Sequence, residues 1–245
     1  YSGQCYPALV YYHAMAYAAQ GGTANLNAAA RLLQDGLAYT PPGDRYRGEA
    51  YDSCPDAPLL RAGLAEVWLR QGRTAQAYSA SQQALEADPR LVPASLVKAE
   101  IEQSLGREDE AAQAVEEALK QIPDDPDLML TRATSLYEAG SYLEGLEMAR
   151  RVIDKSPERN EAWLLYAELL WITADHNAAA AAYDRILALD ETNAKAWFLK
   201  GDSLQNAGRF EEAAIAHERA FSLGGDPSVG LLLSKKMRYL QQKKE

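Results

Sequence analysis

The sequence predicts an all-α fold in which helical hairpins repeat along the chain. Small residues recur every 34 residues, without insertion, over five consecutive units. Within each unit, apolar residues three and four positions apart form two amphipathic stretches around a turn, and a proline or a Gly-Asp-Pro sequence follows the second stretch. One hairpin cannot bury its apolar face alone, so the units are expected to stack. The clearest columns are Gly72, Gly106, Gly140, Ala174 and Gly208 at the turn, and Ala65, Ala99, Ala133, Ala167 and Gly201 in the first helix.

The charge balance argues against two classes of function. The 245 residues include 25 basic and 35 acidic side chains, for a net charge of −10. Phosphate backbones repel such a chain, and its only basic stretch is a short one at the C-terminus, so we expect no nucleic-acid binding. The longest nearly apolar run, Ala8 to Ala19, contains His13. It is shorter than the roughly 18 residues that cross a bilayer, so no membrane span is expected.

The 34-residue unit resembles the tetratricopeptide repeat, with a large residue at slot 4, small residues at slots 8 and 20, an aromatic at slot 24, Ala at slot 27 and Pro at slot 32. The resemblance covers Pro58 to about Gly225 and implies a right-handed α-solenoid that acts as a non-enzymatic protein-binding adaptor. Slot 4 departs from the pattern at Arg61 and Ser95, and slot 32 departs at Glu191 and Gly225. Residues that match the pattern are Trp163, Trp197, Tyr183, Ala84, Ala118, Ala220, Pro89, Pro123 and Pro157.

Three parts are predicted along the chain. In the first, helices are expected over 7–20 and 26–39, forming a divergent hairpin before a long loop. In the last, Leu233, Met237 and Leu240 fall on one face of an expected capping helix whose remaining surface is basic. The predicted parts are the N-terminal hairpin and loop at 1–56, five repeat units at 57–225 and the C-terminal capping helix at 226–245.

Two cysteines, Cys5 and Cys54, each precede an expected first helix. First helices of successive hairpins in the resembled family run side by side in the same direction, so the resemblance implies that the two thiols meet as a disulfide. That bond places the protein in the periplasm or another extracytoplasmic compartment. The alternative is two free thiols in a cytoplasmic protein. The start at Tyr1 without Met suggests a processed protein or a fragment.

The resemblance also implies that first helices line a concave groove. Its predicted surface has an apolar row beside a row of carboxylates, which suits a protein or peptide segment with basic and apolar side chains. The alternative is that the apolar row packs internally and the carboxylates are merely solvated. The predicted groove residues are Tyr11, Tyr12 and Met15 in the N-terminal hairpin, Ala62, Leu96, Leu130, Leu164 and Phe198 at slot 5, Glu66, Glu100, Thr134, Glu168 and Asp202 at slot 9, and Tyr137 and Trp171 at slot 12.

No catalytic, cofactor-binding or metal-binding residues are predicted. The three histidines, His13, His176 and His217, show no metal-ligand spacing, and no nucleophile or phosphate-binding motif occurs. We therefore expect an adaptor or scaffold without catalytic activity, in a bacterial envelope assembly, secretion or maturation complex. The alternatives are a fragment of a larger export machine and a cytosolic co-chaperone-like scaffold. Self-association through the apolar N-terminal hairpin is also left open.

Overall fold

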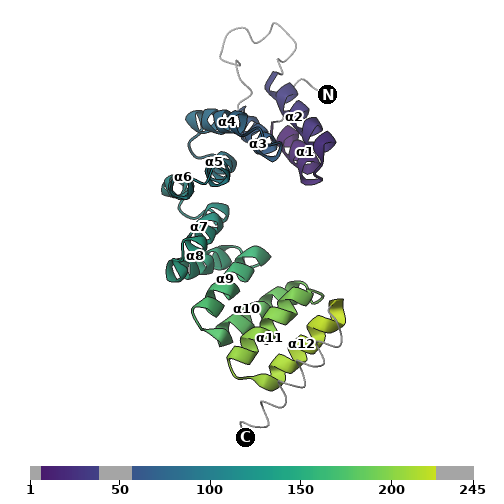
Figure 1. The fold of residues 1–245 in the computed structure, drawn as a ribbon. Helices are drawn as coiled ribbons and strands as arrows, with labels where there is room; N and C mark the ends of the chain where they lie inside the picture. The colour runs from purple at the N-terminus through teal and green to yellow at the C-terminus, as the bar shows by residue number, and fades with distance from the viewer. Residues whose placement is uncertain (1–6, 39–56, 225–245) are drawn as a thin grey trace. The chain divides into compact units, whose positions relative to one another are not determined.

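The computed structural model describes residues 7–38 and 57–224, which form twelve α-helices and contain no strand (Figure 1). The predicted all-α fold is therefore confirmed. Residues 1–6, 39–56 and 225–245 lie outside the described part, and with them both cysteines and the predicted capping helix. The helices are α1 (Pro7–Ala19), α2 (Thr23–Ala38), α3 (Ala57–Arg70), α4 (Thr74–Ala87), α5 (Val92–Ser104), α6 (Glu108–Gln121), α7 (Pro126–Glu138), α8 (Tyr142–Lys155), α9 (Asn160–Ile172), α10 (His176–Leu189), α11 (Ala194–Asn206) and α12 (Phe210–Gly224).

The helices form two compact units, residues 1–128 and 129–245. The first unit contains α1 to α6 and the start of α7, and the second contains the rest of α7 and α8 to α12. Within each unit, consecutive helices pair as hairpins and neighbouring hairpins stack. This is the arrangement that the repeat spacing predicts.

The turn within each hairpin needs a left-handed backbone, which explains the glycine column. Gly72, Gly106, Gly140 and Gly208 have φ between 71° and 78°, a region that glycine enters without a Cβ clash. In the fourth 34-residue repeat, Ala174 takes the same conformation at φ 64°. The 34-residue register therefore keeps the turn geometry even where the glycine is replaced.

Small residues at slots 8 and 20 allow the two helices of a hairpin to cross closely. Ala65 and Ala77 are fully buried in one core cluster of the first compact unit. Ala167 and Ala179 share a core cluster of the second compact unit. At Gly145, an added Cβ would lie 3.4 Å from the carbonyl oxygen of Ala133, in ordinary contact. The close crossing follows from side-chain size, as the sequence predicts.

The slot-4 tryptophans attach a hairpin to the loop before it. The indole Nε1 of Trp163 donates a hydrogen bond to the carbonyl oxygen of Pro157 (2.7 Å), and that of Trp197 donates to the carbonyl oxygen of Glu191 (2.9 Å). Neither side chain found at slot 4 in the first two units, Arg61 or Ser95, carries an indole. The departures from the family pattern therefore remove this particular link.

The N-terminal hairpin packs on the first repeat unit as a further layer. Ala14 and Ala18 of α1 share a core with Leu33 of α2 and with Leu60 and Leu64 of α3. The second helix begins at Thr23, three residues before the predicted start, because the amide of Leu26 already donates to the carbonyl oxygen of Gly22 (3.1 Å). Two helices thus occupy the predicted hairpin, and the second begins earlier than the sequence predicts.

Candidate protein-binding surfaces

An open hollow of about 450 Å³ lies in the first unit, between residues of α1, α3 and α5 and the start of α7. It brings together four of the predicted groove residues, which come from three helices: Tyr11, Glu66, Leu96 and Glu100. Val92, Pro93 and Val97 extend the apolar lining beside Leu96. The result is a concave surface that combines apolar side chains with four carboxylates, Glu66, Glu100, Asp125 and Asp127, and at which a polypeptide side chain can be held.

Glu66 is a partly buried carboxylate of the hollow, with its side chain 21% exposed. Its Oε1 accepts a hydrogen bond from Nη2 of Arg70 at 2.5 Å, one helical turn away. Burial raises the pKa of Glu66 above its usual value, and the nearby Glu100 raises it further, whereas Arg70 lowers it. Burial, followed by the charge of Glu66, also raises the pKa of Tyr11 to about 12, so the phenol stays neutral. One arginine therefore offsets only part of the negative potential in the hollow.

Two other carboxylates of the hollow, Asp125 and Glu100, differ in whether they already accept hydrogen bonds within the protein. Oδ1 of Asp125 accepts from the backbone amides of Asp127 and Leu128, each at 3.0 Å, and so caps the start of α7. The side chain of Glu100 is exposed and forms no hydrogen bond or ion pair with any residue of 7–38 and 57–224. Glu100 is therefore the carboxylate best placed to meet an incoming cation.

Three predicted groove residues of the first unit do not line the hollow. Ala62 is only 1% exposed because its short side chain packs beneath Ala84 and Ala94, so its assignment to the groove surface was wrong. Met15 packs partly buried against the core of the N-terminal hairpin. Tyr12 is 68% exposed and touches Tyr11 edge-on, with ring centroids 5.3 Å apart.

In the second unit, part of the predicted apolar row is used for packing. Leu130 and Tyr137 lie half-buried against one core cluster, and Leu164 lies half-buried against another. The hydroxyl of Thr134 donates to the carbonyl oxygen of Leu130 at 3.1 Å, within its own helix. Leu164 also lines a smaller hollow of about 140 Å³ with Asn160 and neighbouring residues. These side chains thus combine internal packing with a partly accessible edge.

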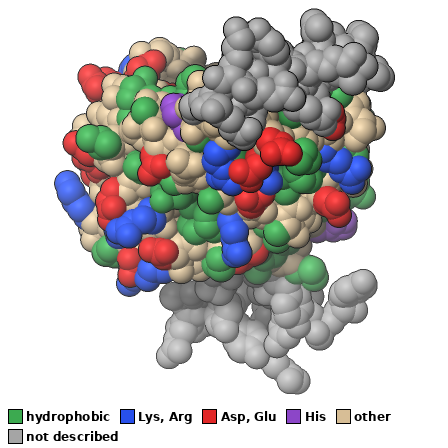
Figure 2. All heavy atoms as spheres, turned by 90° about the horizontal axis from the view of Figure 1, so that it is seen from below, with side chains coloured by type: hydrophobic (Ala, Val, Ile, Leu, Met, Phe, Trp, Pro, Cys, Tyr) green, Lys and Arg blue, Asp and Glu red, His purple; other side chains and the backbone are tan. Residues whose placement is uncertain are grey.

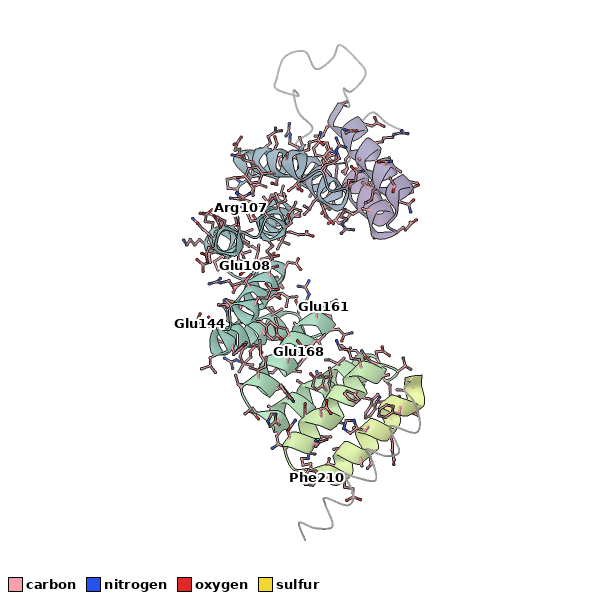
Figure 3. All side chains as sticks on the ribbon, in the orientation of Figure 1. Arg107, Glu108, Glu144, Glu161, Glu168 and Phe210 are labelled. Atoms are coloured by element: carbon pink, nitrogen blue, oxygen red, sulfur yellow. The ribbon has the colours of Figure 1, made fainter. Side chains whose placement is uncertain are left out.

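Two carboxylates of the second unit lie near buried polar groups that the sequence analysis did not connect with them. Glu168, on α9 (Figure 3), and Asp202 both raise the pKa of the Tyr183 phenol, after the larger effect of burial. Asp202 Oδ1 lies 3.5 Å from Nε2 of the fully buried His217. Burial lowers the pKa of His217, against the opposing effect of Asp202, so the imidazole is neutral at pH 7. The aromatic slot 24 was the available signal, because it places these rings beneath the slot-9 carboxylates.

Exposed aromatic rings in the second unit provide further contact surface. Trp171 is 44% exposed and meets His176 edge-on at 6.0 Å between ring centroids. Phe198 is 37% exposed and meets His217 edge-on at 5.1 Å. Both predicted groove positions therefore offer an aromatic edge to a partner, while the opposite edge is packed.

The described surface does not gather basic side chains on the face shown in Figure 2, where acidic, basic and apolar side chains are interspersed. Across residues 7–38 and 57–224, no three His, Cys, Asp or Glu side chains are grouped to hold a metal ion. Of the described helices, none combines the length and the apolar character that a bilayer span requires.

Stacked helical hairpins with accessible first-helix surfaces define the class of helical-repeat proteins that present surfaces to other polypeptides. Two family models described as "Tetratricopeptide repeat" match this chain, one at residues 69–133 and the other at 130–194 and 173–227. Together these matches span more than half of the sequence. The chain belongs to the tetratricopeptide repeat family, whose members are generally non-enzymatic protein-interaction scaffolds.

Solved structures share the fold at low sequence identity. YrrB, described as a TPR protein with an unusual peptide-binding site, is 18% identical over 72% of this chain and 91% of its own, with a TM-score of 0.61. PilF of Pseudomonas aeruginosa is 19% identical over 77% of this chain and 88% of its own, with a TM-score of 0.63. MamA is 14% identical over 68% and 91%, with a TM-score of 0.60. No curated protein sequence matches the chain significantly.

Proposed function

We propose that this chain is a non-enzymatic adaptor that binds a protein segment carrying basic and apolar side chains, and that the hollow of the first unit is its principal site. The observation that carries the proposal is the convergence of Tyr11, Glu66, Leu96 and Glu100, from three helices, on one open concave surface. The peptide-binding site named in the description of YrrB, a protein of the same fold, supports a polypeptide ligand.

The chemistry of the hollow favours one class of segment. Leu96, with Val92 and Pro93 beside it, offers apolar surface whose burial supplies affinity. Glu100 and the incompletely neutralised Glu66 attract a Lys or Arg side chain, whose alkyl stem can cover the apolar lining while its charged end meets the carboxylates. A carboxylate at the same place would be repelled. The expected ligand is therefore an extended segment with a basic residue beside an apolar one.

Charge reversal at Glu100 tests this site. A fluorescent peptide with alternating Lys and Leu residues is expected to bind the unmodified chain more tightly than a matched peptide with Glu in place of Lys. Glu100→Lys should weaken the basic peptide by about tenfold or more, because attraction becomes repulsion. Fluorescence anisotropy measures both affinities.

Glu86→Lys is the matched control, since Glu86 is an exposed carboxylate of the same unit that does not line the hollow. It should leave the affinity within about twofold. Equal weakening by both variants would indicate a general charge effect, and unchanged binding in Glu100→Lys would remove the hollow as the site.

Binding of the basic peptide should depend on pH through Glu66. The pKa of Glu66 in the free protein is raised above 4.5, and a bound cation stabilises the ionised carboxylate and so lowers that pKa. The affinity should therefore be highest at neutral pH and fall as the pH drops through the pKa of Glu66. Anisotropy titrations from about pH 7 to pH 4 measure this dependence. In Glu66→Gln, the decrease in affinity on acidification should be smaller; a decrease of the same size in that variant would contradict the assignment.

We also propose that the adaptor acts outside the cytoplasm, within an envelope assembly, secretion or maturation complex. Cys5 and Cys54, which support this, lie outside the described residues. The prediction is a disulfide between them, which would close a loop of about fifty residues and add roughly 3 to 4 kcal/mol to the free energy of unfolding. Intact mass after alkylation, with and without reductant, counts the thiols. Two alkylated thiols in the unreduced protein would favour the cytoplasmic alternative.

A further inference from the structure

The outward face of α1 is mainly apolar and contains no Asp, Glu, Lys or Arg. Between Pro7 and Ala19 there is no Asp, Glu, Lys or Arg, in a chain that is 24% charged. One side of the helix packs on α2 and α3 through Ala14 and Ala18. The opposite side leaves Leu9 66% exposed and Tyr12 68% exposed. The outward face, which also includes exposed small residues, consists of Ala8, Leu9, Tyr12, His13, Ala16 and Ala19.

Leu9 and Tyr12 are large apolar side chains that lie one helical turn apart on this face, and both are exposed. Apolar patches of this kind mark sites of association.

The charge distribution decides which partner suits this face. A basic segment is attracted to the hollow of the first unit and gains nothing from a face without carboxylates. Two copies of a chain with a net charge of −10 repel one another wherever their charged surfaces meet. A contact through α1, which has no Asp, Glu, Lys or Arg, keeps those surfaces apart and buries Leu9 and Tyr12 of both copies. We propose that two copies of this chain associate through the outward faces of their α1 helices.

A two-fold axis makes the two helices antiparallel and fixes which residues meet. When the axis crosses the outward face at the level of residue 14 along the helix, Tyr12 of each copy faces Ala16 of the other, and Leu9 faces Ala19. Each large side chain then lies over a small one, and the helices can approach to the 8 to 10 Å that is usual for packed helices. Large residues at 9 and 12 and alanines at 16 and 19 thus make this face complementary to itself.

Sedimentation equilibrium of the full chain tests the association. The unmodified protein is expected to be dimeric at about 100 µM and to dissociate on dilution. Leu9→Glu and Ala19→Lys should each weaken the dimer at least about tenfold, because each introduces a charge that the contact buries. Neither change should disturb the helix, since an acidic residue suits its first turn and a basic residue its last. Gln34→Lys, at an exposed position of α2, is the control and should remain dimeric.

Mixing the two variants tests the register. In a mixed dimer, the new glutamate at position 9 of one copy faces the new lysine at position 19 of the other, and the second pair keeps the original Leu9 and Ala19. An equimolar mixture of Leu9→Glu and Ala19→Lys should therefore recover a dimer, and added salt should weaken it. A monomer at about 100 µM in the unmodified protein would overturn the proposal. Dimers that persist in both variants, or a mixture that stays monomeric, would overturn it as well.

Discussion

Gly201→Ala should lower the free energy of unfolding of the last described hairpin by about 1 kcal/mol, although alanine is the better helix former. A Cβ at this position would lie 2.6 Å from Cε1, 2.7 Å from Nδ1 and 2.8 Å from Nε2 of His217. The ring is fully buried, and it also touches Phe198, so it has little room to move. Overpacking of this kind costs about 1 to 3 kcal/mol, more than the roughly 1 kcal/mol that Gly→Ala gains inside a helix.

Urea unfolding followed by circular dichroism measures the loss, and hydrogen exchange of the α11 and α12 amides locates it. Gly145→Ala is the matched control, because its Cβ would make only ordinary contacts, the nearest at 3.4 Å. That variant should gain up to about 1 kcal/mol. In a His217→Ala background the ring is absent, and Gly201→Ala should then become stabilising. If Gly201→Ala destabilises equally with and without the ring, the steric explanation fails.

The same pair shows what the sequence can predict. The repeat spacing places Gly201 in the small-residue column of slot 8 and His217 at the aromatic slot 24, and both positions are buried as expected. The spacing does not explain why the fifth repeat unit has glycine at slot 8 where the other four units have alanine. The reason is the contact between two slots 16 residues apart, which depends on the orientation of one buried ring.

The candidate groove was predicted with similar limits. Slot geometry predicts that Glu66, Leu96 and Glu100 share one accessible surface, and in the structure all three line the same hollow. It fails at Ala62, since exposure at slot 5 depends on how far a side chain extends beyond its neighbours, and alanine does not reach the surface.

The sequence contains a signal for the position of Tyr11 in the hollow, namely Gly63 inside a predicted helix. An added Cβ at Gly63 would lie 3.0 Å from the Tyr11 ring, so the glycine makes room for that ring above α3. A glycine inside a predicted helix often marks such a close approach. The size and depth of the hollow, in contrast, depend on side-chain positions that periodicity does not specify.

Glu102 provides the second large expected effect. It lies in α5 with its side chain 5% exposed, and its Oε2 is 2.9 Å from Nε of Arg107, in the turn before α6 (Figure 3). The arginine is 45% exposed and is the cation that this carboxylate meets. Arg107→Ala should lower the free energy of unfolding by about 3 kcal/mol, because it leaves a buried carboxylate without its partner. Urea unfolding of the full chain measures this loss.

A double-mutant cycle separates the pair from other effects of the turn. Glu102→Gln keeps the shape of the side chain without its charge, so Arg107→Ala in that background should cost less than about 1 kcal/mol. Arg150→Ala is the control for removing an exposed arginine, since both Arg150 and its partner Glu147 are more than half exposed. It should cost less than about 0.5 kcal/mol. A larger loss in Arg107→Ala than in Arg150→Ala would show that burial of the carboxylate gives Arg107 its importance. If the full loss of stability remains in the Glu102→Gln background, Arg107 acts instead through the backbone of the turn.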